Sequence, residues 1–172
     1  GQFGMIAFGL LIVATGLYSA RSHRTRMHQA MTDHLTGLPS RRQFLEVGAQ
    51  AVATGRDGAW AAILMIDLDR FKEVNDNLGH NIGDLLLKDV TKRIAYCVRE
   101  VDSLSRIGGD EFALILSGVK GTHFVDRIAQ SIINELSDAF QINGETIYIS
   151  ASIGITLSPE DSSVANELLK NA

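Results

Sequence analysis

The first pattern along the chain is an apolar segment near the amino terminus, which carries no charged residue from Phe3 to Ala20. Its eighteen residues reach the lower limit of a transmembrane helix, which needs about 20. Three arginines follow within residues 21–26, and positive charge beside a span marks its cytoplasmic side. We therefore expect residues 1–20 to end a transmembrane helix of the inner (cytoplasmic) membrane, and residues 21–32 to form a cytoplasmic linker helix. A signal-peptide core would carry its charges before the apolar run instead, and a buried helix is the other alternative.

The rest of the chain alternates between short apolar runs, which are typical of strands, and apolar stripes at helical spacing. Leu86, Val90 and Ile94 belong to one such stripe. Gly-Gly at 108–109 and Asn-Gly at 143–144 predict hairpin turns. The pattern predicts helices over residues 41–52, 83–98, 124–136 and 164–172, and strands over residues 61–66, 103–107, 112–116, 140–142 and 146–157.

The order of these elements indicates the fold class. Helices stand between some of the strands but not between all of them. That order favours an α+β fold, with helices packed on a sheet rich in antiparallel pairs. It is the ferredoxin-like pattern with additions. The length of 172 residues suits one domain, since roughly 100–200 residues per domain is usual.

Composition excludes several classes of function. The chain has 16 Lys and Arg against 20 Asp and Glu, a formal net charge of −4, and one cysteine. A single cysteine excludes an internal disulfide framework and a zinc site made of several thiolates. The mild acidic excess argues against nucleic-acid binding through bulk positive charge. The chain begins with Gly rather than Met and ends within a predicted helix, so we expect it to be part of a longer protein.

Acidic residues fall at two places where the predicted elements expose them. Asp67 lies at the carboxyl end of a predicted strand, and Asp110 and Glu111 follow the Gly-Gly turn. Oxygen ligands suit Mg²⁺, which usually takes one or two protein carboxylates and leaves its other positions to water and phosphate. If the hairpin lies beside the strand, these acids converge and could support a two-metal displacement at a phosphate. Spacing alone leaves open the alternative that they are solvated turn residues.

Five sequence blocks carry a resemblance to a known family. Residues 106–112 read RIGGDEF, which resembles the signature of the GGDEF family, the diguanylate cyclases. The other blocks resemble family motifs at the family's spacing: DHLTGLPSRR at 33–42, DLDRFKEVND at 67–76, GHNIGD at 79–84 and SIGI at 152–155. Ser40 departs from the family, in which Asn is common there. Several motifs in order are far more specific than one pentapeptide, and they place a GGDEF domain at residues 33–172.

The resemblance implies a fold and a reaction. The fold is a palm-type domain, similar to that of nucleotide cyclases. The reaction condenses two GTP into cyclic di-GMP, releases two pyrophosphates and depends on Mg²⁺ (or Mn²⁺). Each domain would bind one GTP, so activity would require a homodimer, and the product would inhibit it. The alternative is a catalytically silent module that binds GTP or cyclic di-GMP and regulates an attached domain, such as an EAL phosphodiesterase.

The resemblance also implies roles for residues at the matching motif positions. Catalysis and metal binding would fall to Asp67, Asp110 and Glu111, with the carbonyl of Leu68 as a backbone ligand. Guanine would be recognised by Asn75 and Asp84. The phosphates would be met by Lys72 and by the backbone around Arg70 and Phe71. An inhibitory product site would consist of Arg99 and Asp102, since an arginine can fork onto O6 and N7 of a guanine.

Plainer interpretations of several of these residues stay open. Asp84 could be an acid at a helix amino terminus, where the helix dipole favours it. Lys72 could be a solvated charge. Arg99 could be an arginine at a helix carboxyl terminus, followed by Asp102 at the start of a strand.

A few other residues carry weaker expectations. Asp33 could pair with Arg106 and tie the linker to the catalytic hairpin, or it could serve only its local turn. Cys97 is expected to be a small core residue. His34 and His80 are expected to be structural or surface residues, because neither has a partner at metal-binding spacing.

The end of the chain departs from the family pattern. In the family, the last helix continues into a segment with a Lys and an Arg that hold the triphosphate, and a last strand follows. The chain stops at Ala172, before both. We therefore expect the GGDEF domain to be incomplete at its carboxyl terminus.

Overall fold

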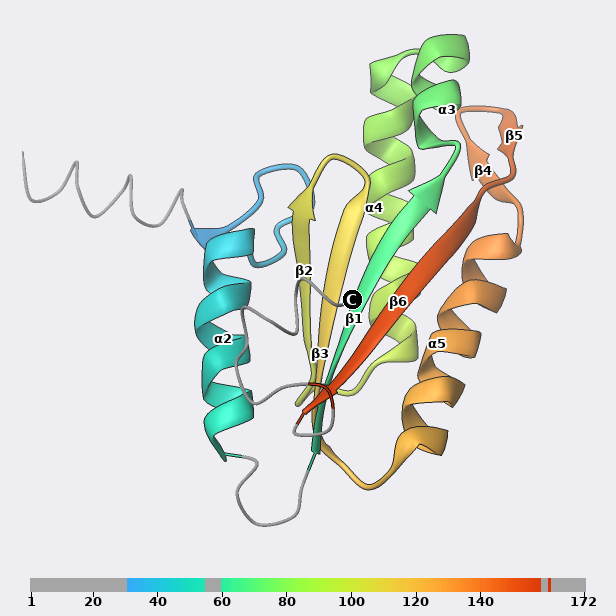
Figure 1. The fold of residues 1–172 in the computed structure, drawn as a ribbon. Coiled ribbons are helices and arrows are strands. Elements are labelled where there is room, and N and C mark those ends of the chain that lie inside the picture. Colours follow the sequence, from blue (N-terminus) through green and yellow to red (C-terminus); the bar gives the residue numbers. More distant parts are fainter. Residues whose placement is uncertain (1–30, 55–59, 159–160, 162–172) are drawn as a thin grey trace, which may run out of the picture.

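A four-stranded sheet runs through the middle of the described part of the molecule (Figure 1). The computed structural model describes residues 31–54, 60–158 and 161. The strands lie in the order β2 (Ser103–Gly108), β3 (Glu111–Val119), β1 (Trp60–Asp69) and β6 (Ser150–Ser158), and every neighbouring pair is antiparallel. Along the chain, these strands and the helices between them follow the strand-helix-strand-strand-helix-strand order of ferredoxin-like folds. The expectation of an α+β fold with an antiparallel sheet is confirmed.

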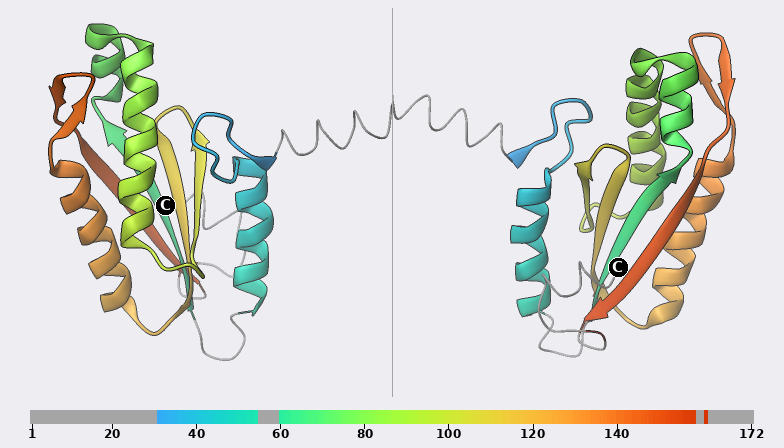
Figure 2. Two further views of the ribbon diagram at one scale, coloured as in Figure 1. Left: turned by 180° about the vertical axis from the view of Figure 1, so that it is seen from behind. Right: turned by 45° about the horizontal axis from the view of Figure 1, so that its top comes forward.

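Helices cover both faces of this sheet, as the three views in Figures 1 and 2 show. One face carries α3 (Phe71–Leu78), α4 (His80–Cys97) and α5 (Thr122–Ser137), and the other carries α2 (Arg41–Thr54). Successive side chains of a strand point to opposite faces. In β1, Leu64 and Ile66 therefore join the larger core with α4 and α5, whereas Ile63 packs with Phe44 of α2.

Most predicted elements are present, with bounds that differ by a few residues. The predicted helices over 41–52 and 124–136 correspond to α2 and α5. The predicted strands over 61–66, 103–107 and 112–116 correspond to β1, β2 and β3. Cys97 packs against the larger core, as expected.

The short helix α3 was not predicted by the sequence pattern. Only two of its eight residues, Phe71 and Val74, are buried, so it has no apolar stripe long enough to recognise. Gly79 follows it with a φ of 87°, a left-handed conformation that glycine adopts without steric cost. This residue separates α3 from α4.

The start of α4 corrects a second expectation. The helix begins at His80 rather than at Gly83, because the turn at Gly79 comes earlier than the apolar stripe suggests. The first turn of α4 contains no acidic residue. The alternative that Asp84 is an acid of the helix amino terminus is therefore wrong.

The strand predicted over residues 146–157 is two strands in the structure. Its first part is β5 (Glu145–Ile147), which pairs with β4 (Phe140–Ile142) in a separate two-stranded sheet. The turn between them uses Asn143 and Gly144, whose φ values are 51° and 86°. Its second part is β6, which pairs with β1. Isoleucines alternate across both parts, so the pattern cannot show that the chain changes partner.

Several predicted segments lie outside the described residues. They are the membrane helix over residues 1–20, nearly all of the linker over 21–32, and the helix over 164–172. Among the residues that the structure describes, none of the helices has the length and apolar character needed to span a membrane. The membrane anchor and the cytoplasmic location stay predictions from the sequence.

The carboxylate of Asp33 ties the segment before α2 to β2. It accepts hydrogen bonds from the Thr36 N–H at 2.9 Å and from the Thr36 hydroxyl at 2.6 Å. Nη1 of Arg106 donates to its two oxygens at 3.0 and 3.1 Å. Both roles expected for Asp33, the local turn and the pairing with Arg106, are therefore present together. Burial alone would raise the pKa of Asp33, but these hydrogen bonds and the charge of Arg106 hold it below its ordinary value.

We expect the free energy of unfolding at pH 7 to be about 1.5–3 kcal/mol lower in the Asp33→Asn variant than in the parent. This is the range for hydrogen bonds to charged groups. Because the folded-state pKa of Asp33 is lowered, its contribution is present above the unfolded-state pKa and is lost as pH falls through the folded-state pKa. Urea unfolding of parent and variant at a series of pH values measures this. The difference between them should shrink at the acid end, and a difference that stays constant would contradict a role for the charge.

Candidate active site

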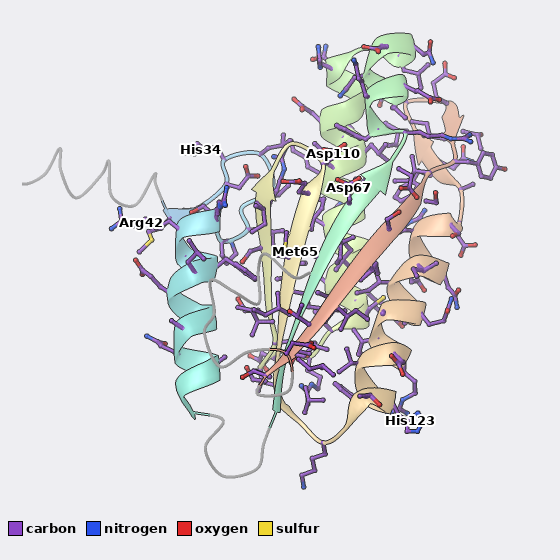
Figure 3. All side chains as sticks on the ribbon, in the orientation of Figure 1. His34, Arg42, Met65, Asp67, Asp110 and His123 are labelled. Atoms are coloured by element: carbon purple, nitrogen blue, oxygen red, sulfur yellow. The ribbon has the colours of Figure 1, made fainter. Side chains whose placement is uncertain are left out.

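Two acidic side chains face each other across the first and third strands. Asp67 of β1 is the direct antiparallel partner of Glu111 of β3, and side chains so paired have Cβ atoms about 4.5–5.5 Å apart. Asp67 lies two residues after Met65, and Glu111 lies two residues before Ala113. Both of these neighbours pack in the cluster with Phe44 of α2, so the two acids lie on that face of the sheet. The N–H of Leu68 donates to the carbonyl of Asp110 at 3.3 Å. Figure 3 shows Asp67 and Asp110 at the same end of the sheet, so the predicted convergence of the acids is present.

The electrostatics of this pair suit a cation. Burial raises the pKa of Asp67, and the negative charges of Asp110, Glu111 and Asp69 raise it further. Within the described residues, the salt bridges do not include Asp67, Asp110 or Glu111. Arg41 of α2 lines a cavity together with Glu111, but it forms no salt bridge with these acids.

Open space lies next to the carboxylates. A cavity of about 300 Å³ is lined by Asp67, Glu111, Ser152 and Gly154, together with apolar residues of β1 and β6. A second cavity of about 240 Å³, between α2 and the sheet, shares Met65 and Glu111 with the first. A phosphate group and a hydrated cation could reach the carboxylates from this side.

The donor chemistry fits Mg²⁺. Asp67 and Glu111 supply hard oxygen atoms, and the carbonyl of Leu68 follows Asp67 in the same strand. In the described part of the chain, no group of three or more histidine, cysteine or acidic side chains forms a ready-made metal cage. Mg²⁺ does not need one, since it usually binds one or two carboxylates and keeps its other positions for water and phosphate oxygens.

Asp69 is part of the site although the sequence motifs gave it no role. Its carboxylate accepts hydrogen bonds from the hydroxyls of Ser150 at 2.7 Å and of Ser152 at 2.9 Å. Ser150 is its direct partner in β6, and Ser152 is the partner of Asp67. Asp69 therefore fixes the start of β6 against the end of β1. Only the pairing of the two strands reveals this contact, because the residues are about 80 positions apart in the chain.

The turn that carries Asp110 is held from one side by an arginine. Arg106 donates from Nε and Nη2 to the carbonyl of Gly109 at 3.0 and 2.7 Å, while its Nη1 holds Asp33. Gly109 has a φ of 51°, which is costly for most other residues. The Arg106 side chain is 11% exposed, so the turn and the segment before α2 share one well-shielded guanidinium.

The residues expected to bind GTP gather beside the same end of β1. Arg70 has a φ of 63° and turns the chain from β1 into α3. Phe71 is buried in the core, so only its backbone is available to a ligand, whereas Lys72 is exposed. Asn75 of α3 lies against Gly83 of α4, next to the exposed Asp84. These positions agree with the expected set but do not by themselves test it.

The pair Arg99 and Asp102 lies at the other end of the sheet. Both residues lie in the loop between α4 and β2. Arg99 donates from Nε and Nη2 to the two carboxylate oxygens of Asp102, at 3.0 and 2.7 Å. It also donates to the carbonyl of Ser117 at 3.0 Å and lies over the ring of Phe124. Neither residue belongs to the cluster around Asp67.

Two of the described histidines, His34 and His123, stand apart from these acids. Figure 3 shows His34 before α2 and His123 at the start of α5, neither beside Asp67.

Comparison of the sequence with known protein families supplies evidence that the geometry of the site does not. A family model described as "Diguanylate cyclase, GGDEF domain" matches residues 30–172.

The chain belongs to the GGDEF family. It is 40% identical over 162 residues to the bifunctional diguanylate cyclase/cyclic di-GMP phosphodiesterase MucR of Pseudomonas aeruginosa, covering 94% of this chain and 23% of MucR. It is also 40% identical over 147 residues to the diguanylate cyclase TpbB of that species, covering 84% of this chain and 34% of TpbB. The cyclic di-GMP phosphodiesterase NbdA, again from that species, is 38% identical over 152 residues, which are 88% of this chain and 19% of NbdA. The chain thus spans well under half of each of these relatives.

Solved GGDEF domains have the same fold as the described residues. The GGDEF domain of TpbB from P. aeruginosa superposes with a TM-score of 0.80 at 38% identity, covering 82% of this chain and 83% of that one. A sensory box/GGDEF family protein from Caulobacter crescentus gives a TM-score of 0.79 at 33% identity, with coverages of 83% and 93%. The GGDEF fold expected from the motifs is confirmed.

Replacing Arg106 should loosen the turn of this GGDEF domain. Lysine cannot form the fork of N–H groups that holds Gly109 and Asp33 together. We expect Arg106→Lys to speed amide hydrogen exchange at residues 108–110 about three- to tenfold, the equivalent of one net hydrogen bond. Arg42→Lys is the matched control, because Arg42 is half exposed and, among the described residues, its salt bridge is an i,i+4 pair with Glu46. Equal exchange at the turn in both variants would mean that Arg106 does not hold it.

Proposed function

We propose that the protein is a diguanylate cyclase, which condenses two GTP into cyclic di-GMP and releases two pyrophosphates. The observation that carries the proposal is the pairing of Asp67 with Glu111 beside an open cavity, where neither acid forms a salt bridge with a described side chain. The complete RIGGDEF signature and the relatives named as diguanylate cyclases support it.

The proposed reaction is a pair of phosphoryl-group transfers. The 3′-hydroxyl of one GTP attacks the α-phosphorus of the other, a phosphodiester bond forms, the bond to pyrophosphate breaks, and the same step is repeated with the roles exchanged. Mg²⁺ (or Mn²⁺), held by Asp67, Glu111 and the Leu68 carbonyl with Asp110 assisting, supplies charge that stabilises the attacking and leaving oxygens when bound. Arg106 and Asp69 keep the strands and the turn that bear these acids in place.

The substrate contacts follow from the junction of β1 with α3 and α4. The first N–H groups of a helix have no partner within the helix and suit phosphate oxygens, and Lys72 adds positive charge there. Asp84 offers a carboxylate to the N1 and N2 donors of guanine, which adenine lacks as a pair. Asn75, on the facing helix α3, contacts the preceding residue, Gly83. This arrangement supports GTP rather than ATP as the substrate.

The stoichiometry of the reaction implies a homodimer. Each domain offers one constellation of this kind, and the reaction joins two GTP. Two copies of the domain therefore have to present their nucleotides to each other. Dimerisation would then control activity.

The product is proposed to bind at Arg99 and to inhibit. A guanidinium has five N–H donors, and three of these hold Asp102 and Ser117. The Arg99 side chain is 42% exposed, whereas that of Asp102 is fully buried. Arg99 is thus the residue that can contact a guanine, and Asp102 holds it in position.

A silent regulatory module is the second candidate function. It is favoured by relatives that are named as cyclic di-GMP phosphodiesterases. One of them, NbdA, contains a stretch similar to most of this chain. Against it, all of the acids implied in catalysis are present in this chain. Activity of the full-length protein separates the two.

We expect Glu111→Gln to lower the rate of cyclic di-GMP formation from GTP and Mg²⁺ by about a hundredfold or more. The substitution keeps the size of the side chain but removes a negative ligand, and metal charge contributes several kcal/mol to such transition states. Chromatography of the product measures the rate. Glu46→Gln, which changes an exposed glutamate of α2, is the matched control. Parent-like product formation by Glu111→Gln would refute the metal role, and an inactive parent would favour the silent module.

We expect Arg99→Ala to weaken product inhibition about tenfold or more while catalysis persists. A bidentate contact to guanine contributes about 1–3 kcal/mol to discrimination, which corresponds to roughly a tenfold change in affinity. The measurement is the initial rate against added cyclic di-GMP. Identical inhibition curves for parent and variant would show that the pair is only structural, and a variant without activity in the absence of product would mean that Arg99 supports the fold.

A further inference from the structure

The packing of α3 on α4 leaves no room for a side chain at Gly83. A Cβ atom built on Gly83 would overlap Oδ1 of Asn75 and would lie 3.0 Å from its Cγ. Gly83 is buried, and it lies within α4. The side-chain amide of Asn75 therefore occupies the space that any other residue would need at position 83.

The backbone gives no reason for a glycine at this position. Gly79, at the turn between the two helices, has a φ of 87°, but Gly83 has no left-handed conformation that other residues would avoid. Glycine inside a helix is less favourable than alanine. What the structure requires at position 83 is the missing side chain, not backbone freedom.

The side-chain amide of Asn75 packs on Gly83. This half-buried side chain makes no hydrogen bond to another residue that the structure describes. Its amide rests on Gly83, and Asp84 is the next residue of α4. One helix contact thus places the Asn75 amide against the residue that precedes Asp84 in α4.

We propose that Gly83 is a positioning residue for guanine recognition, because its missing side chain lets the Asn75 amide pack on α4 at the residue before Asp84. The inference rests on the proposed function, since it takes GTP as the ligand. An alanine at this position would displace the end of a flexible side chain, and the next contact, Cζ of Phe71 at 3.3 Å, needs only a small adjustment. The substitution should therefore spare the fold and disturb the amide.

A double-mutant cycle in the full-length protein tests the inference. The variants are Gly83→Ala, Asn75→Ala and the combination of both, with Asn81→Ala as a control on the exposed side of the same helix turn. We expect Gly83→Ala to raise KM for GTP about three- to tenfold, the equivalent of one lost hydrogen bond. We also expect kcat and the thermal midpoint to stay close to those of the parent. On the Asn75→Ala background, the same change should leave KM unaltered, because no amide remains to be displaced.

Two results of the double-mutant cycle would overturn the inference. A loss that is equal on both backgrounds would mean that the alanine acts through Phe71 or through helix packing. The absence of a loss on either background would mean that Asn75 does not depend on Gly83. Calorimetric binding of GTP to each variant keeps the test independent of turnover. A parent that binds GTP but forms no cyclic di-GMP would reject the proposed reaction while the cycle still decides the role of Gly83, and a parent that binds no GTP would overturn both.

Discussion

The register of β1 against β3 is the constraint on which the candidate active site depends. It sets Asp67 opposite Glu111, and a slip by one residue would turn one of the two carboxylates to the other face of the sheet. The acids do not hold this register, because their charges repel each other and raise the pKa of Asp67. The register is held by buried neighbours such as Ile66 and Phe112. Burial of apolar surface thus keeps two repelling groups together, ready for a cation.

Polar contacts fix the chain around the acids once the apolar core has set the register of the strands. The guanidinium of Arg106 joins the turn before Glu111 to the segment before α2, through Gly109 and Asp33. The carboxylate of Asp69 joins β1 to β6. These contacts do not create the fold, but they fix the chain on both sides of the acids. A displacement of the segment before α2 would therefore move the turn at Gly109, because the shielded side chain of Arg106 contacts both.

The two groups of residues expected to bind nucleotides lie at opposite ends of the sheet. Asp67 lies near the carboxyl end of β1, whereas Arg99 lies in the loop before β2. The first residue of β2 pairs with Ile115, which is the partner of Ile63, four residues before Asp67. The strand β2 thus connects the loop of Arg99 to the turn of Asp110. Product bound at Arg99 would not occupy the space beside the acids, so any inhibition has to act at a distance from them.

The sequence by itself determined the fold class, the hairpin that carries Asp110 and Glu111, and the family, because long apolar patterns and ordered motifs are local properties of the chain. It did not determine α3, whose two buried residues leave no visible stripe, or the division of residues 146–157 between two sheets, across which the alternation is unbroken. Three contacts were decided only by the tertiary structure. Asp69 contacts two serines of β6, and the buried carboxylate of Asp102 binds the guanidinium of Arg99. Gly83 leaves space for the side chain of Asn75. The physical reason is common to all three: each depends on which surfaces pack together, and side chains distant in the chain meet only once the core has chosen the strand and helix partners.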